Sequence, residues 1–201
     1  MTDLSGSFKS RHVGKWFLLL ASMLALLFVG CNEAGPDVSD VVFKTHNNGY
    51  GFKMLYPENW TESLISQGLM AFGEAEDVSA ATAAGTAAST VVVFRRQPQA
   101  FESLQAEFAR YVEGGPEASG FVSEDGIHET TLDGRQAFEV LTQTDPELIA
   151  AEDRPDTTLY IIAVYADNGV TYYVTATAPT EDWEEMWPIF QVMIASFEVL
   201  E

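Results

Sequence analysis

The sequence predicts an α+β domain in which an antiparallel β-sheet is sandwiched by helices. Several short runs of β-branched and aromatic residues are separated by Gly, Asn and Asp turns, a pattern typical of antiparallel hairpins. Two other segments, one in the middle of the chain and one at its end, repeat apolar residues every three or four positions, and this spacing predicts helices. Because a sheet must bury its apolar face against another layer, the helices are expected to cover it.

The first 30 residues are predicted to form the signal peptide of a lipoprotein. Basic residues at Lys9, Arg11 and Lys15 precede an apolar run of about 14 residues, which is short for a bilayer span of roughly 20. The run ends in LFVGC at residues 27–31, which resembles the lipobox of bacterial lipoproteins. In that family the cysteine thiol, here Cys31, receives diacylglycerol, and the leader is cut before it.

Two other interpretations of the leader are a soluble secreted protein and an uncleaved signal anchor. Cys31 is the only cysteine, so it has no partner within the chain for a disulfide, and this favours its use as the lipid acceptor. We therefore expect an exported protein that is anchored by lipid to the cell membrane or outer membrane and faces the periplasm or the cell exterior. Residues 31–40 are predicted to be the lipidated cysteine and a flexible tether, and residues 41–201 a single domain.

The charge of the chain restricts its partners. The formal net charge is −20, and since the leader carries three basic residues and one acidic residue, the remainder carries −22. Such a field repels nucleic acid and anionic headgroups, and it favours cationic partners and loosely held divalent cations. A solvated surface suited to an exported protein is the simpler interpretation of the same charge.

The first half of the domain is predicted to contain a hairpin, two further strands and a helix. Strands at 41–46 and 50–56 flank the turn residues Asn47, Asn48 and Gly49. Further strands are expected at 69–73 and 90–95. The small residues of 78–90 predict a mobile loop, with a short alanine-rich helix as the alternative.

An amphipathic helix at 97–112, ended by two glycines, is the clearest helix of the domain. Two hairpins follow, at 121–144 and 157–178, with an acidic loop at 145–156 between them. The second hairpin is expected to supply the central strands. A helix at 180–197 ends the chain.

Short motifs in this order resemble the PsbP-like superfamily, which includes DcrB-like bacterial lipoproteins and the Mog1 proteins. The motifs are Tyr56-Pro57 followed by Trp60, the turn at 132–137, the tyrosines at 172–173, and the helix end at 194–197. The resemblance covers residues 41–201 and implies an antiparallel sheet sandwiched by helices. It also implies a binding or accessory domain without catalysis. The photosynthetic branch resembles an extrinsic subunit of photosystem II, whereas the Mog1 branch binds a nuclear GTPase that an exported lipoprotein would not meet.

The sequence contains no recognisable catalytic set, and we predict no cofactor. No serine lies in a G-x-S-x-G turn, and the remaining histidines, His46 and His128, are far apart in the chain, which disfavours a zinc site. His128 beside Glu129 could join a weak metal site, although an exposed acidic hairpin is the simpler interpretation. The acidic turns lack the regular ligand spacing of an EF-hand loop.

Trp183 and Trp187 are the predicted partner-binding surface, because residues four apart share one face of a helix. Core packing is the alternative for these rings. The leading hypothesis is a non-enzymatic, membrane-anchored lipoprotein that binds or stabilises a membrane-associated partner or complex. A module for a small ligand or divalent cation is the second hypothesis, and a hydrolase using carboxylates is the third.

Overall fold

The computed structural model describes residues 38–47, 49–81, 88–97, 103–152, 154–167 and 169–200. Its contacts divide the chain into a unit from Met1 to Gly35 and a unit from Pro36 to Glu201. The predicted leader, Cys31 and most of the tether lie outside the described residues. None of the described helices is long and apolar enough to cross a membrane.

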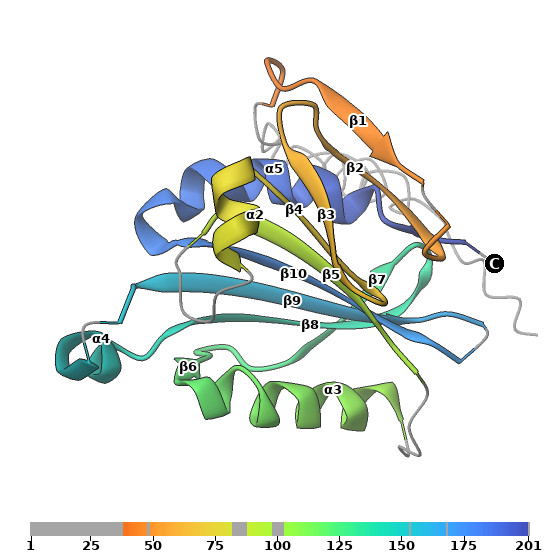
Figure 1. The fold of residues 1–201 in the computed structure, drawn as a ribbon. Helices are drawn as coiled ribbons and strands as arrows, with labels where there is room; N and C mark the ends of the chain where they lie inside the picture. Colours follow the sequence, from red (N-terminus) through yellow and green to blue (C-terminus); the bar gives the residue numbers. More distant parts are fainter. Residues whose placement is uncertain are drawn as a thin grey trace, which may run out of the picture. The chain divides into compact units, whose positions relative to one another are not determined.

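Eleven strands in the described ranges form two antiparallel sheets. They are β1 (Phe43–His46), β2 (Phe52–Pro57), β3 (Thr61–Ser66), β4 (Leu69–Gly73), β5 (Thr90–Arg96), β6 (Phe121–Val122), β7 (His128–Leu132), β8 (Arg135–Thr144), β9 (Thr157–Tyr165), β10 (Thr171–Pro179) and β11 (Glu198–Val199). The large sheet has the order β3-β4-β5-β10-β9-β8-β6, with β7 also paired to β8 (Figure 1). The small sheet has the order β1-β2-β11.

Helices lie on both faces of the large sheet. They are α2 (Ala75–Ala81), α3 (Leu104–Gly114), α4 (Pro146–Glu152) and α5 (Trp183–Ala195), with short 3-10 turns η1 (Glu117–Ser119) and η2 (Thr180–Asp182). Figure 1 shows α3 below the sheet and α5 above it. This arrangement confirms the predicted α+β fold with an antiparallel sheet sandwiched by helices.

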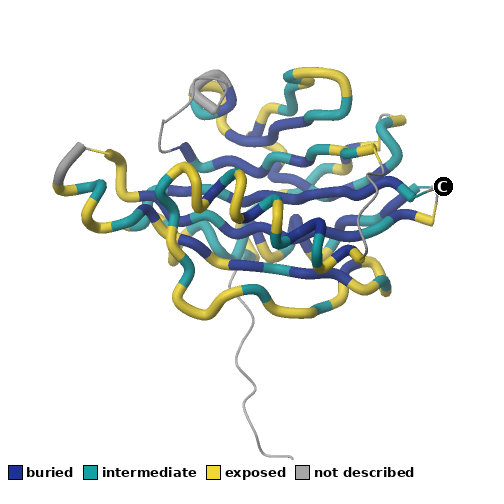
Figure 2. The backbone as a smooth tube through the Cα atoms, turned by 90° about the horizontal axis from the view of Figure 1, so that it is seen from below, coloured by how far each residue is buried: buried dark blue, intermediate teal, exposed yellow. Residues whose placement is uncertain are grey.

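Successive side chains of the central strands point to opposite faces of the large sheet, and each face has its own hydrophobic core. On β9, Ile162 joins the core under α5 and the small sheet, whereas its neighbour Ile161 joins the core under α3. Figure 2 shows that most residues along the central strands are buried. The hairpin predicted at 157–178 is confirmed as β9 and β10, and its strands are central as expected.

Two other predicted hairpins are also present. β1 and β2 pair in the register Phe43↔Pro57, which confirms the opening hairpin. β7 and β8 meet at a tight turn in which Asp133 has φ 53° and Gly134 has φ 69°. Positive φ at both central positions is the signature of a type I′ turn, which matches the right-handed twist of the strands.

The prediction of a mobile loop at 78–90 is wrong for residues 78–81, which belong to α2. Glu76 and Asp77 lie in the first turn of α2 and suit its positive end. Val78 is only 5% exposed, and its Cγ2 lies 3.3 Å from where a Cβ on Gly73 would be, so the helix packs closely on β4. The short-helix alternative was correct for these residues, while residues 82–87 lie outside the described ranges.

Four other elements, α3, α4, β3 and β11, differ from the predictions. Helix α3 begins at Leu104 rather than residue 97, because the Ser103 hydroxyl accepts the Ala106 amide proton at 3.1 Å and so caps the helix. The predicted acidic loop at 145–156 contains α4, whose first turn is stabilised by the Asp145 carboxylate accepting the Glu147 amide proton. Two strands, β3 and β11, were not predicted at all.

Candidate functional site

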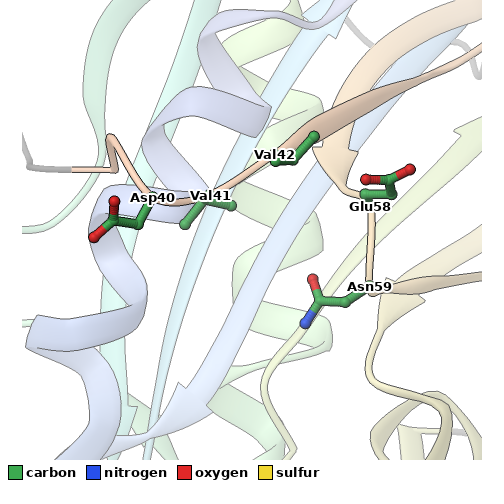
Figure 3. A pocket seen from close by; sticks show the side chains of 5 residues that line it. All are labelled: Asp40, Val41, Val42, Glu58 and Asn59. Atoms are coloured by element: carbon green, nitrogen blue, oxygen red, sulfur yellow. The ribbon is translucent and has the colours of Figure 1, made fainter.

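Two adjoining pockets share Val41 and Asn59 and form one groove beside the segment that leads into β1. The first has a volume of about 440 Å³ and is lined by Asp40, Val41, Val42, Glu58 and Asn59. Figure 3 shows that these residues come from two segments, the chain that leads into β1 and the turn that follows β2. The second pocket has a volume of about 380 Å³ and is lined by Val41, Pro57, Asn59, Trp60, Glu74, Asp77, Ser89, Glu185, Met186 and Ile189. We call the two pockets together the acidic groove.

The turn after β2 is held in place by backbone hydrogen bonds and by Lys44. The Glu58 amide donates to the Val42 carbonyl at 2.7 Å, and the Trp60 amide donates to the Pro57 carbonyl at 3.0 Å. The Lys44 ammonium donates to the carbonyls of Glu58 and Trp60 at 2.8 and 3.0 Å, and it lies 4.7 Å from the centre of the Tyr56 ring. This nearby lysine is therefore used to fix the turn.

Carboxylates dominate the charge of the groove. The lining includes Asp40, Glu58, Glu74, Asp77 and Glu185, and none of the lining residues that the structure describes is basic. Because most of these side chains are exposed, their field is screened over a Debye length of about 8 Å at physiological salt, and it acts mainly on a cation within the groove. Within the described ranges, no three His, Cys, Asp or Glu residues are arranged to hold a metal ion.

The floor of the groove is apolar and continues into a row of aromatic rings. Trp60 is 5% exposed and meets Phe190 edge-on, with ring centroids 6.3 Å apart. Phe190 contacts Trp183 at 5.6 Å, and Trp183 stacks on Trp187 at 5.2 Å. Trp187 in turn meets the ring of Tyr160 at 5.0 Å. We call these five residues the aromatic row.

The predicted surface of Trp183 and Trp187 therefore lies beside the groove. Both side chains are half-buried and pack against the core under α5, so each ring has a buried part and an accessible part. Tyr160 faces Leu141 across β8 and β9, and Leu141 is 46% exposed. An apolar strip thus leads from the floor of the groove to the surface, and partner binding by the two tryptophans stays a prediction.

The start of α5 adds more negative charge next to the tryptophans. Glu181 and Asp182 belong to η2, and Glu184 and Glu185 lie in the first turn of the helix. All four residues are exposed. Acidic residues are favourable at the positive end of a helix, which gives a structural reason for their position. All four lie within two residues of Trp183 in the sequence, so negative charge is concentrated at this end of the helix.

A buried carboxylate that the sequence analysis did not identify lies on α3. Glu107 is 0% exposed, and it accepts hydrogen bonds from the hydroxyls of Tyr165 at 2.8 Å, Tyr173 at 3.1 Å and Thr171 at 3.2 Å. Burial, together with Glu107, raises the pKa of Tyr165 and Tyr173. The signal was present, since Glu107 is three residues after Leu104 on the buried face of the helix. The geometry indicates that Glu107 holds α3 on the sheet.

The two histidines of the domain are not brought together. His46 is buried on β1 of the small sheet, and its Nδ1 lies 2.8 Å from Oε2 of Glu62. His128 is exposed on β7 of the large sheet, where it faces Glu139 of β8. The structure therefore gives no support to a joint site of the two residues.

Comparison with known proteins relates the domain through its fold. No family model matches the chain, and no curated protein matches it in sequence. The Ran-binding protein Mog1p of Saccharomyces cerevisiae superposes with a TM-score of 0.53 at 11% identity, over 80% of this chain and 97% of that one. LpqN, involved in cell envelope biogenesis of Mycobacterium tuberculosis, gives 0.52 at 13% identity, over 80% and 92%.

Cyanobacterial PsbP (CyanoP) from Synechocystis gives a TM-score of 0.50 at 11% identity, over 81% of this chain and 95% of that one. The chain therefore has the fold of the PsbP and Mog1 proteins, as the short sequence motifs implied. Each of the three superpositions covers nearly the whole of the solved structure, so the likeness concerns the complete domain. At this level of identity it shows the fold and does not identify a shared ligand.

Proposed function

We propose that this protein is a membrane-anchored accessory lipoprotein that binds a cationic, amphipathic segment of a membrane-associated partner, without catalysis. The observation that carries the proposal is the acidic groove: its described lining residues include five carboxylates and no basic side chain, and Trp60 lies in its floor. Lysine or arginine side chains of the partner would meet the carboxylates. Apolar side chains of the same segment would pack on Trp183 and Trp187.

The position of the groove favours a partner close to the membrane. Val41 lines both pockets and directly follows the predicted tether. If Cys31 is lipidated, the ten residues from 31 to 40 extend at most about 36 Å. A groove beside the attachment point is therefore within reach of segments that emerge from the bilayer. The negative charge of the domain would disfavour its own contact with anionic headgroups.

The aromatic row supplies the kind of contact that stabilises protein interfaces. Tryptophan is enriched among interface residues whose truncation to alanine weakens binding by about 2 kcal/mol or more. Trp183 and Trp187 are supported from below by Phe190 and Tyr160, so their rings are held in position before a partner arrives. The carboxylates at the start of α5 would contribute more to orientation and association rate than to affinity.

The comparisons support a binding role without naming the partner. One structural neighbour is described as Ran-binding, and another as involved in cell envelope biogenesis. A cationic small ligand is a second candidate, because each pocket of the groove falls within the roughly 300–1,000 Å³ of ligand sites. A protein partner would be recovered with the chain on purification, whereas a cationic small ligand would not bring another protein with it.

The proposal is tested by crosslinking in cells and purification from native membranes. Four forms are compared: the unchanged chain, Cys31→Ala, a groove variant and a control. The groove variant combines Glu58→Gln, Asp77→Asn and Glu185→Gln, which neutralise three lining carboxylates. The control combines Glu117→Gln, Glu124→Gln and Glu147→Gln, which remove the same charge from exposed positions elsewhere.

We expect one membrane complex to be recovered with the unchanged chain and the control, and to be lost with Cys31→Ala and the groove variant. Equal recovery with the groove variant and the control would contradict the role of the groove. Recovery of no partner with the unchanged chain would contradict the accessory role itself. In that case, calorimetric titration of the purified chain with a cationic amine such as spermidine would test the second candidate.

A further inference from the structure

The last part of β8 is open to solvent on the face of the large sheet that carries α5. The even-numbered side chains from 138 to 144 are all buried, on the face that packs against α3. The odd-numbered side chains point to the α5 face, where Ala137 is buried in the core but Leu141 and Gln143 are exposed. One face of β8 is thus covered along its length, whereas the other is uncovered toward its end.

The open end of β8 belongs to an apolar patch that spans three strands. Leu141 is 46% exposed and lies opposite Tyr160 of β9. Val122 of β6 is 42% exposed and lies opposite Gln143 of β8, and a pocket of about 210 Å³ includes Val122 and Leu141 in its lining. Large apolar side chains are exposed at four described positions, so two of the four meet here. We call Val122, Leu141, Gln143 and Tyr160 together the β8 shelf.

The space beside α5 on this face has the width of one helix. Helix α5 packs on β10, and the order of the sheet puts β9 and then β8 next to β10 (Figure 1). Neighbouring strands lie about 4.8 Å apart, so β8 is about 9.6 Å from β10. Helices that pack against each other have their axes about 8–10 Å apart. A helix placed next to α5 would therefore lie on β8, over Leu141, with Trp187 of α5 and Tyr160 at its side.

A segment that lies on the face of a sheet must satisfy its own backbone. Leu141 and Tyr160 are paired within the ladder of β8 and β9, whose hydrogen bonds run in the plane of the sheet. The face of these strands therefore offers side chains to a partner, while their backbone groups point sideways. An extended segment would bury its own N–H and C=O groups there without partners, whereas a helix pairs them internally. This favours a helix on the shelf.

Carboxylates dominate the charge at the border of the β8 shelf. Glu124 and Asp125 are exposed and line its pocket, and none of the described lining residues of that pocket is a lysine or an arginine. Glu139 is half-buried and accepts the proton of the Tyr160 hydroxyl, and the exposed His128 lies opposite it. A second copy of this acidic chain would be repelled, and so would anionic headgroups. The charge therefore favours a cationic helix.

We propose that the β8 shelf binds a cationic, amphipathic α-helix of the membrane-associated partner, which lies beside α5 and continues the helical layer over β8. Apolar side chains three and four positions apart on that helix pack on Leu141, Val122 and the edge of Trp187. Its lysine or arginine side chains face Glu124 and Asp125. The inference rests on the proposed function, since it concerns the same partner, and it adds the conformation of the bound segment and a second contact region.

Site-specific photocrosslinking of the full chain in native membranes tests the proposal. Benzoylphenylalanine replaces one exposed residue at a time: Leu141 on the shelf, Asn59 in the acidic groove, or Leu64 on β3 at the opposite edge of the large sheet. We expect one partner to be captured from positions 141 and 59 and not from 64. Capture from 59 alone would overturn the shelf and leave the proposed function intact. Capture from none of the three would overturn both, and equal capture from 141 and 64 would overturn the shelf.

A matched pair of substitutions measures the contribution of the shelf. Leu141→Ser and Leu64→Ser each remove a leucine that is about half exposed on a strand, at 46% and 49%. Without crosslinking, we expect Leu141→Ser to lower the amount of partner recovered about tenfold, because the leucine loses its burial under the helix, and Leu64→Ser to leave it unchanged. Equal recovery with the two variants would contradict the proposal.

Mass spectrometry of the crosslinked peptides tests the conformation of the bound segment. Photocrosslinkers at Leu141 and at Gln143 point from the same face of β8, about 6.8 Å apart along the strand. We expect the labelled positions of the partner to repeat every three or four residues, as one face of a helix does. Labels on alternate residues would indicate an extended segment and overturn the helical part of the inference, even where the partner itself is recovered.

Discussion

His46 and Glu62 join the two sheets at their edges, with His46 Nδ1 2.8 Å from Glu62 Oε2. His46 lies on β1, an edge strand of the small sheet, and Glu62 lies on β3, an edge strand of the large one. The histidine ring is buried and stacks on Phe52 at 4.8 Å, while its Nε2 has no hydrogen-bond partner among the described residues. The contact to Glu62 is therefore the polar anchor of this ring.

We expect Glu62→Ala to lower the free energy of unfolding by about 2 kcal/mol, because it leaves both nitrogens of a buried imidazole without a partner. Urea denaturation followed by circular dichroism measures the change. Glu124→Ala truncates an exposed carboxylate and should cost less than about 0.5 kcal/mol. Similar costs for the two variants would show that His46 does not depend on Glu62.

A larger loss of folding stability is expected when Glu107 is replaced, because its carboxylate accepts hydrogen bonds from three hydroxyl groups. Glu107→Ala should cost about 3 kcal/mol or more, since it leaves buried donors unpaired and opens a cavity under α3. Tyr165→Phe removes only one of the three hydrogen bonds and should cost about 1 kcal/mol. If both variants unfold at the same urea concentration, the three contacts do not act together.

The turn between β7 and β8 permits a matched pair of glycine substitutions. Gly134 has φ 69°, and a Cβ there would meet no atom within 4 Å, so Gly134→Ala tests backbone strain alone. We expect Gly134→Ala to lower the free energy of unfolding by about 1–2 kcal/mol. Gly114 in α3 has the same open surroundings without positive φ, so Gly114→Ala should be neutral or stabilising by up to about 1 kcal/mol. Thermal unfolding of both variants checks the difference in sign.

Alkaline pH should destabilise the domain. Burial, with a contribution from Glu62, raises the pKa of Tyr56 to about 12, and burial also raises that of Tyr111 to about 12. Because the folded state then holds these protons more tightly than the unfolded state, whose tyrosines titrate near pH 10, the stabilisation is complete below pH 10 and is lost as the pH rises to about 12. Urea midpoints between pH 8 and 12 measure the effect, and Tyr111→Phe should flatten the decline. A midpoint that stays constant to pH 12 would contradict the assignment.

The layers of this fold could be predicted from sequence because they depend on local signals. Runs such as LYIIAVY and VTYYVTATA specify strands by themselves, and the Asp133-Gly134 turn specifies its own geometry. The two strands that were missed depend on distant partners. β3 has an irregular pattern of burial, with its register shifted between Leu64 and Ser66, and β11 consists of two residues that pair with β2. Neither strand carries enough local preference to be recognised alone.

Parts of the candidate sites were beyond sequence reasoning for the same reason. The acidic groove combines residues from before β1 to α5. In contrast, Trp183 and Trp187 could be placed together on one helix face because helical spacing is a local property, and partner binding by them stays a prediction. The abundance of acidic residues concealed Glu107, although its position on the buried face of α3 distinguishes it from the others.

Quenching of tryptophan fluorescence distinguishes core packing from partner binding by the tryptophans of the aromatic row. Trp60 is buried, whereas Trp183 and Trp187 are half-buried, so acrylamide should quench the latter pair more strongly. The measurement uses the mature full chain with either Trp60 or the α5 pair replaced by Phe. Addition of the crosslinked partner, or of its cationic segment, should protect the pair and leave Trp60 unchanged, because the partner covers the accessible ring edges. Equal protection of Trp60 and the pair without a partner would show that both tryptophans of α5 serve only the core.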